Sequence, residues 1–290
     1  MADDLVTKLA NAKTPEEVDA AAAELNKKIK ENSPKAAAKR INLLDEVRGI
    51  CVLCMVCYHA FYVCSAQFAL EWGTKAYEFF LPAQPVFAAL FILIAGICSR
   101  LSRDVKKRGF MLAAVAMAIT FVTMLVLPAL GFQGVQVWFG VLHLLAVSML
   151  IFGFGKRLFD KIPAFVGVLV CLALFFLTAP VSQGYLGMFG LRIALPEALY
   201  QGNALFFLGF HKPDFVSWDY FPLLPYFFLF LFGSFMGKFA EKESFPAFCY
   251  KPHSLFFGFL GRHALPIYLL HVPVFYGLVY FLRALLSLGR

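Results

Sequence analysis

Charged residues are scarce in this chain of 290 residues. Asp, Glu, Lys and Arg together make up 15% of it, whereas a typical soluble domain contains about 25% charged residues. Hydrophobic residues make up 61% and aromatic residues 17%, so too few polar side chains remain to cover a soluble domain of this size. The composition excludes a soluble enzyme and a disordered chain, and it predicts an integral membrane protein.

Acidic residues are outnumbered as well, with 18 Asp and Glu against 26 Lys and Arg and a net charge of +8. An excess of basic residues is typical of proteins that bind nucleic acids. In so apolar a chain it more simply indicates the cytoplasmic loops of a membrane protein, which are rich in Lys and Arg. We therefore expect the membrane bilayer as a partner, and no nucleic acid.

A disulfide framework is lacking, although the chain contains 7 Cys, because most of them lie inside apolar segments. Cys51, Cys54 and Cys57 lie three positions apart, a spacing that drifts around a helix, and no fourth ligand accompanies them. A free Cys in such a segment behaves as a small hydrophobic residue. We expect no metal site.

Long apolar segments dominate the rest of the chain. A membrane-spanning helix needs about 20 mostly apolar residues. Segments that meet this requirement cover residues 47–66, 79–98, 110–130, 137–154, 163–180, 220–237 and 264–286. No sustained alternation of period two accompanies them, which argues against strands. The pattern predicts an all-α membrane helix bundle of about seven transmembrane helices, formed by residues 41–290.

Residues 1–40 differ in kind from the remainder. Residues 14–17, Thr-Pro-Glu-Glu, are typical of a helix start, with an N-cap, a first-turn Pro and early carboxylates. Apolar residues then recur at helical spacing as far as Ile29. We expect a short amphipathic helix here, cytosolic or at the membrane surface, as a segment separate from the transmembrane domain.

Basic residues are distributed unevenly between alternate connections, which predicts the orientation. Of the 26 Lys and Arg, 21 fall in the N-terminal segment and in every second connection after it. Because cytoplasmic loops carry the excess of Lys and Arg, the N-terminus is expected inside and the C-terminus outside. The long connection 181–219 is then expected outside, as a cover over the outer end of the bundle.

Three histidines lie within apolar spans, where ionisable residues are costly and mark functional sites. Counting about 1.5 Å per residue places His59 and His143 at similar depth in the outer half of the membrane, and His271 nearer the cytoplasm. The matched depth predicts a polar cavity shared by His59 and His143. The alternative is that each histidine forms a packing hydrogen bond between helices.

Other polar residues lie at the ends of spans. Asp45 and Arg48 fall close to the face of the first span that carries His59, which predicts an inward-facing polar stripe. Asp219 and Tyr220 mark the outer rim of the sixth span. For both pairs the alternative is anchoring at the lipid headgroups.

Five segments read in order carry a resemblance to a known family. They are LLDEVRGICVLCMVCYH, AALFILIAGICSRLSR, VWFGVLHLLAVSML, DYFPLLPYFFLFLFG and LGRHALPIYLLHVPV. Together they resemble the heparan-alpha-glucosaminide N-acetyltransferase catalytic-domain family, in particular its bacterial members, over residues 41–278. The positions that match the family pattern are Asp45, Arg48, Gly49, His59, Gly96, Ser99, Gly140, His143, Asp219, Pro222, Pro225, Gly261, Leu265, Tyr268 and His271.

The resemblance implies transfer of an acetyl group from cytoplasmic acetyl-CoA to an amino or hydroxyl group of a sugar reached from outside. The catalytic residues are then expected among His59, His143 and His271, and acceptor-binding residues among Asp45, Asp219, Tyr220 and Tyr268. The sequence departs from the pattern of the animal lysosomal enzymes at one place. The connection after the first span contains no histidine, and His59 stands where those enzymes have an Asn.

The assignment agrees with the chemistry of the residues. An attacking amine or alcohol loses a proton as it meets a thioester, and His is the side chain suited to accept it near neutral pH. Basic side chains of the first cytoplasmic connection are expected to hold the CoA phosphates together with Arg48; they are Arg103, Lys106, Lys107 and Arg108. The alternative for this connection is that its charge only sets the topology.

The sequence thus favours an acyltransferase of a bacterial cytoplasmic membrane that modifies envelope sugars or glycolipids. A homo-oligomer is compatible with it. The rival interpretation is a transporter or lipid-binding protein whose histidines line a pathway.

Overall fold

The computed structural model describes residues 40–68, 70–129 and 135–288. The predicted N-terminal helix lies outside the described residues. The predicted all-α bundle is confirmed: six described helices are long and apolar enough to cross a membrane, or seven if one bent pair is counted as a span. The helices are α3 (Asn42–Phe68), α4 (Glu71–Phe80), α5 (Gln84–Leu101), α6 (Val105–Phe121), α7 (Leu127–Ala129), α8 (Val141–Lys161), α9 (Ala164–Thr178), α10 (Leu223–Glu241), α11 (Leu255–Arg262) and α12 (Ala264–Leu288).

The second span begins earlier than the apolar pattern indicates. The segment Glu71–Leu101 forms one candidate span, in which α4 and α5 are joined by a 3-10 turn at Leu81–Ala83. Pro82 and Pro85 each stand in the first turn of a helical segment, where the missing N–H removes no helical hydrogen bond. These prolines therefore do not interrupt the span.

Two close crossings between helices depend on glycine. A Cβ at Gly261 of α11 would lie 1.8 Å from the carbonyl oxygen of Asp45 in α3, and one at Gly96 of α5 would lie 2.0 Å from that of Phe230 in α10. In a membrane, helices associate by such close packing, because lipid chains are as apolar as the side chains. The core beside these crossings contains Ile92, Leu144, Phe152 and Phe230, each fully buried.

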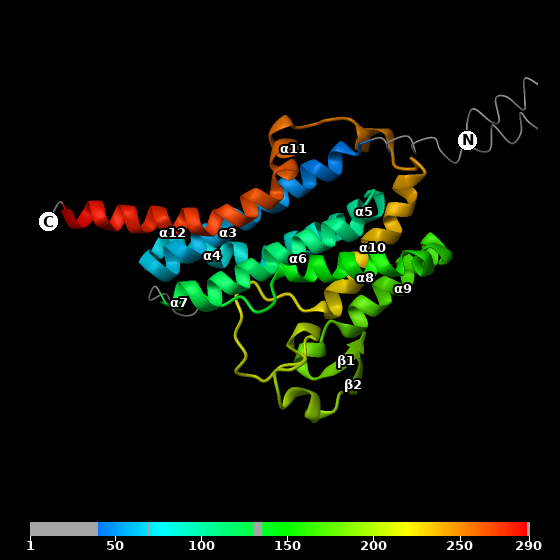
Figure 1. Cartoon of the computed structure of the whole chain (residues 1–290), viewed down its shortest axis with the longest axis horizontal. Helices are drawn as coiled ribbons and strands as arrows, with labels where there is room; N and C mark the ends of the chain where they lie inside the picture. Colours follow the sequence, from blue (N-terminus) through cyan, green and yellow to red (C-terminus); the bar gives the residue numbers. More distant parts are fainter. Residues whose placement is uncertain (1–39, 69, 130–134, 289–290) are drawn as a thin grey trace, which may run out of the picture. The chain divides into compact units, whose positions relative to one another are not determined.

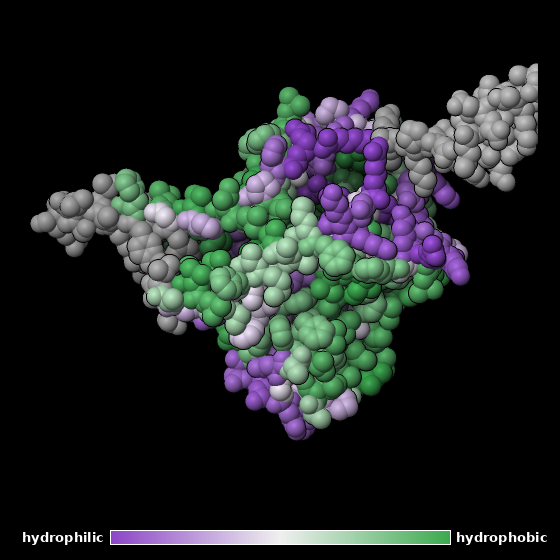
Figure 2. Space-filling view, viewed as in Figure 1, coloured by the Kyte–Doolittle hydropathy of each residue, from purple (hydrophilic) through white to green (hydrophobic). Residues whose placement is uncertain are grey.

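The ends of three spans meet at one end of the bundle. Arg100 at the end of α5 pairs with Asp160 of α8, and Lys238 of α10 donates to the carbonyl oxygens of Phe159 and Ile162. Figure 2 shows hydrophobic residues over the middle of one face, with hydrophilic residues around the connection of α10 to α11 and again beside the strands.

The connection between α9 and α10 contains the two described strands, which the sequence pattern did not predict. Strand β1 (Tyr185–Met188) pairs antiparallel with β2 (Leu191–Ala194), beyond the end of α9 (Figure 1). Phe189 and Gly190 join them with φ of 50° and 91°, as in a two-residue hairpin turn. Strands of four residues are too short to show a reliable alternation.

Candidate functional site

A cavity of about 50 Å³ lies among α3, α5, α12 and the start of α8. This volume has room for a few water molecules. We call it the His59 cavity; it is lined by Cys51, Val52, Met55, Tyr58, His59, Gln84, Phe87, Ala88, Phe91, Val141, Asp219, Phe221 and Tyr268. Its polar groups therefore come from segments that are distant in sequence: α3, the start of α5, the connection before α10, and α12.

Two histidines form a hydrogen-bonded pair at this cavity. His59 Nδ1 lies 2.7 Å from His271 Nε2, and His271 Nδ1 lies 2.6 Å from the carbonyl oxygen of Tyr268. A carbonyl oxygen only accepts, so His271 Nδ1 carries a hydrogen and donates it. In a neutral imidazole the other nitrogen then accepts, so His271 Nε2 accepts from His59 Nδ1.

This order of donors fixes the tautomer of His59. With its hydrogen on Nδ1, the neutral ring has an unprotonated Nε2. No described residue donates to that nitrogen. His59 thus brings a free proton acceptor to the cavity, held in place by His271 and, through it, by the backbone of Tyr268.

The side chain of Tyr268 contributes a second polar contact to the same cavity. Its hydroxyl donates to Asp219 Oδ2, and the backbone N–H of Val141 donates to the same oxygen over 3.2 Å. Removal from water raises the pKa of Asp219 to about 6, although both hydrogen bonds act in the opposite direction. The carboxylate also lies at the N-terminus of α8, where the helix dipole favours negative charge.

A short backbone pairing holds Asp219 in this place. The N–H of Trp218 donates to the Gln136 carbonyl and the N–H of Phe221 donates to that of Phe139. Asp219 between them has a φ of 51°, a conformation that Asp tolerates better than most residues. The connection before α10 is thereby fixed against the segment that leads into α8.

His143 lies apart from the histidine pair. Its Nδ1 accepts from the Gly140 N–H over 3.2 Å, and its Nε2 lies 3.0 Å from the Thr120 hydroxyl, which donates to the carbonyl of Val137. Both ring nitrogens are thus engaged in joining the start of α8 to α6. His143 does not line the His59 cavity.

The prediction that His59 and His143 share one cavity is therefore wrong. The partner of His59 is His271. The estimate of depth counted residues along straight helices. The last apolar segment is instead preceded by α11, which meets α12 at an angle of 81°, so a count of residues along one straight helix does not give the depth of His271.

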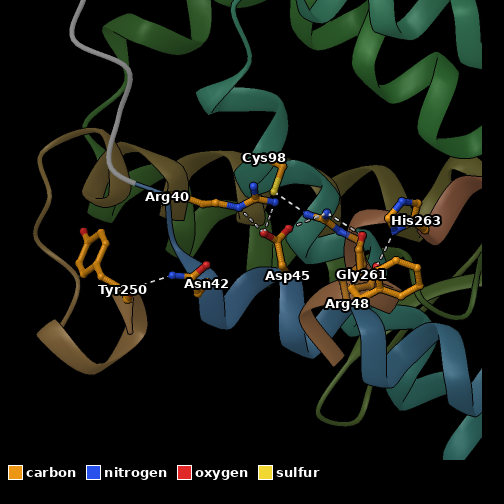
Figure 3. Close-up of polar contacts among 9 residues, drawn as sticks. Arg40, Asn42, Asp45, Arg48, Cys98, Tyr250, Gly261 and His263 are labelled. Carbon is orange, nitrogen blue, oxygen red and sulfur yellow. Dashed lines mark hydrogen bonds and ion pairs between the residues drawn. The ribbon is translucent and has the colours of Figure 1, made fainter. Parts of the chain in front are cut away.

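Asp45 and Arg48 form an ion pair away from the His59 cavity (Figure 3). Arg48 donates to Asp45 Oδ1 over 3.2 Å and to Cys98 Sγ over 2.8 Å, and Arg40 donates to the other oxygen of Asp45. A weaker contact reaches the carbonyl of Gly261. The cluster joins the start of α3 to α5 and α11, at the close crossing of α3 with α11.

The remaining predicted residues are outside the cavity as well. Arg103, Lys106, Lys107 and Arg108 are exposed at the start of α6. The Tyr220 hydroxyl donates to the Phe206 carbonyl over 2.5 Å, and burial raises the pKa of Tyr220. Tyr220 thus ties the connection 206–220 together beside Asp219.

Two polar lining residues, Tyr58 and Gln84, were not predicted. Tyr58 precedes His59, and its hydroxyl lies 3.2 Å from that of Tyr77 in α4. Gln84 begins α5 and is the one amide in an otherwise apolar helix up to Cys98. An isolated polar residue before a long apolar segment is the signal that could have identified Gln84.

A family model matches residues 40–273, from two residues before α3 to the middle of α12; it describes the catalytic part of heparan-alpha-glucosaminide N-acetyltransferase. No curated protein and no solved structure matches the chain. The match covers every residue of the His59 cavity and the Asp45 cluster, and it spans well over half of the chain. The chain therefore belongs to the heparan-alpha-glucosaminide N-acetyltransferase catalytic-domain family, which indicates a multi-pass membrane acetyltransferase.

Proposed function

We propose that this protein transfers an acetyl group from cytoplasmic acetyl-CoA to an amino or hydroxyl group of an envelope sugar or glycolipid, in a bacterial cytoplasmic membrane. The observation that carries the proposal is the unprotonated Nε2 of His59 at a cavity shared with Asp219 and Tyr268. Membership of the acetyltransferase family supports the reaction class.

His59 acts as the general base in this proposal. As the acceptor nitrogen or oxygen attacks the thioester carbonyl carbon, its proton moves to His59 Nε2. The His59 Nδ1–H then donates more strongly to His271, whose own Nδ1–H donates to the Tyr268 carbonyl. The developing positive charge is shared along this line. When the carbon–sulfur bond breaks, the proton passes to the CoA thiolate, which restores the neutral pair.

Asp219 and Tyr268 bind the acceptor. Tyr268 and the Val141 N–H both engage Oδ2 of Asp219, and no described residue donates to its Oδ1. That oxygen can accept a hydrogen bond from a sugar hydroxyl or an amine. Asp45 and Tyr220 are bound within the protein, so they position helices and connections rather than touch substrate.

The CoA phosphates bind to the exposed cations at the start of α6. Arg103, Lys106, Lys107 and Arg108 lie within six residues of one another and are exposed, which fits a ligand with several phosphate charges. The side chain of Asp104, which lies among them, accepts from the Lys107 N–H and so fixes the start of the helix. Arg48 contributes indirectly, since its guanidinium is already engaged.

The decisive experiment measures acetyl transfer directly. Purified full-length protein is incubated with acetyl-labelled acetyl-CoA and a panel of amino sugars, neutral sugars and glycolipids. We expect release of CoA that depends on one class of acceptor, with the label recovered on that acceptor. Absence of transfer over the whole panel, together with sugar flux into proteoliposomes, would instead establish the transporter.

A further inference from the structure

A second hollow, of about 380 Å³, lies between the end of α9 and the β1–β2 hairpin. It shares no lining residue with the His59 cavity. Its walls include Phe176 at the end of α9, Tyr185 and Gly187 of β1, and Phe189 and Arg192 from the turn and β2. We call it the hairpin groove.

The hairpin presents a cation to this groove. Arg192 pairs with Gly187 in the strand register, and its side chain is exposed. The guanidinium lies 5.1 Å from the centre of the Tyr185 ring, which leaves its N–H groups free for an anion. Arg192 has no hydrogen bond or ion pair with any described residue, and no acidic residue lines the groove.

An apolar surface leads along α9 to the groove. Phe165, Leu169, Leu172 and Phe176 are exposed and follow one another at helical spacing, so they form a stripe on a helix that spans the membrane. Phe176 is also part of the groove wall. In the hairpin turn, Phe189 is 94% exposed. A large apolar side chain so exposed marks a contact with lipid or with a partner.

We propose that the hairpin groove binds an anionic membrane lipid. Arg192 pairs with the lipid phosphate, while the acyl chains lie along the stripe of α9 and against Phe189. Continuity of the groove with the lipid-facing stripe favours a membrane lipid over a protein, since the same surface already requires acyl chains beside it. The charge distribution of the sequence places this groove at the outer surface of the membrane.

The test measures lipid affinity of the delipidated full-length protein in neutral detergent, by native mass spectrometry during titration with phosphatidylglycerol or phosphatidylcholine. We expect tighter binding of phosphatidylglycerol. Arg192→Gln should lower that affinity about fivefold, as expected for one basic residue at a membrane surface, and Phe189→Ser should weaken both lipids. Lys212→Gln and Val216→Ser are the matched controls, since both residues are exposed in the same connection and neither lines the groove.

Unchanged affinity in Arg192→Gln, or an equal loss in Lys212→Gln, would overturn the proposal. Glycerol phosphate is added as a competitor to separate a lipid from a free phosphate ester. If it displaces phosphatidylglycerol at equal concentration, the groove recognises a soluble anion and the assignment to a membrane lipid is wrong. The measurement does not depend on acetyl transfer, so its outcome is independent of the proposed reaction.

Discussion

At the residue scale, the hydrogen-bond partners of a side chain distinguish a candidate catalytic residue from a structural one. His59 and His143 are both histidines in apolar spans, yet both nitrogens of His143 are engaged, whereas Nε2 of His59 has no hydrogen-bond partner among the described residues. Residue type and depth, which the sequence provides, do not distinguish them. Their hydrogen-bond partners distinguish them: His143 contacts residues nearby in sequence, whereas the partner of His59 comes from α12, far along the chain.

Replacement of the histidines should separate these two roles. We expect His59→Ala to lower the rate of transfer per folded molecule about 10²–10⁴-fold, as for loss of a general base, and His271→Ala to lower it about 10–100-fold by releasing His59. His143→Ala should instead lower the melting temperature, because it removes the contacts of α8 with Thr120. Normal turnover in His59→Ala would remove this residue from the mechanism.

Asp219 should make stability depend on pH. Its pKa of about 6 in the folded protein lies above its ordinary value of 3.8, so the folded state binds the proton more tightly than the unfolded state. Stability is then highest below pH 4 as far as this group is concerned, and it falls as the pH rises through 6. In Asp219→Asn, which retains an acceptor for Tyr268, the melting temperature should decline less between pH 4 and 7. Parallel melting curves for the two proteins would contradict this assignment.

At the scale of elements, the sequence predicts the positions of the apolar spans but not the bends between helices or the contacts that depend on them. Each span is a continuous apolar segment, so most span positions follow from composition alone. Three features do not follow from the apolar pattern: the early start at Glu71, the bend between α11 and α12, and the hairpin at Phe189. They depend on packing between elements or lie in segments too short to show a pattern. The partner of His59 could not be predicted for the same reason.

The crossing of α3 with α11 should tolerate no side chain at Gly261. A Cβ there would lie 1.8 Å from the Asp45 carbonyl oxygen, so we expect Gly261→Val to separate the helices and lower the melting temperature by about 5 °C or more. Gly277→Val is the control, because no described atom lies within 4 Å of a Cβ at that position. Size-exclusion profiles and melting curves of the two variants measure the difference.

The start of α6 should affect donor binding without affecting the chemical step. We expect the double variant Lys106→Gln, Lys107→Gln to raise KM for acetyl-CoA about tenfold with little change in kcat, as for loss of binding that is equal in the ground and transition states. Lys156→Gln is the control, since this basic residue lies in α8 and outside the proposed phosphate site. An unchanged KM would mean that this charge only sets the topology.

At the scale of the whole molecule, orientation in the membrane remains a prediction of the charge distribution. Single cysteines at Lys106 and Lys212, in a background without native cysteines, should differ in their reaction with an impermeant thiol reagent. Lys212→Cys should be labelled in intact cells, and Lys106→Cys only after lysis. The reverse labelling pattern would show that the predicted orientation is wrong and that the hairpin groove lies on the cytoplasmic side.

Tyr268 couples Asp219 to the histidine pair through direct contacts, without a large motion. Its hydroxyl donates to Asp219 and its carbonyl accepts from His271, so in the proposed mechanism one residue contacts both the carboxylate that binds the acceptor and the partner of the general base. Thermodynamic linkage makes the effect reciprocal. If acceptor binding raises the proton affinity of His59, protonation of His59 raises the affinity for the acceptor by the same factor. In the proposed mechanism, acceptor binding that favours the protonated base leaves His59 a weaker base when no acceptor is present, which protects the thioester from attack by water.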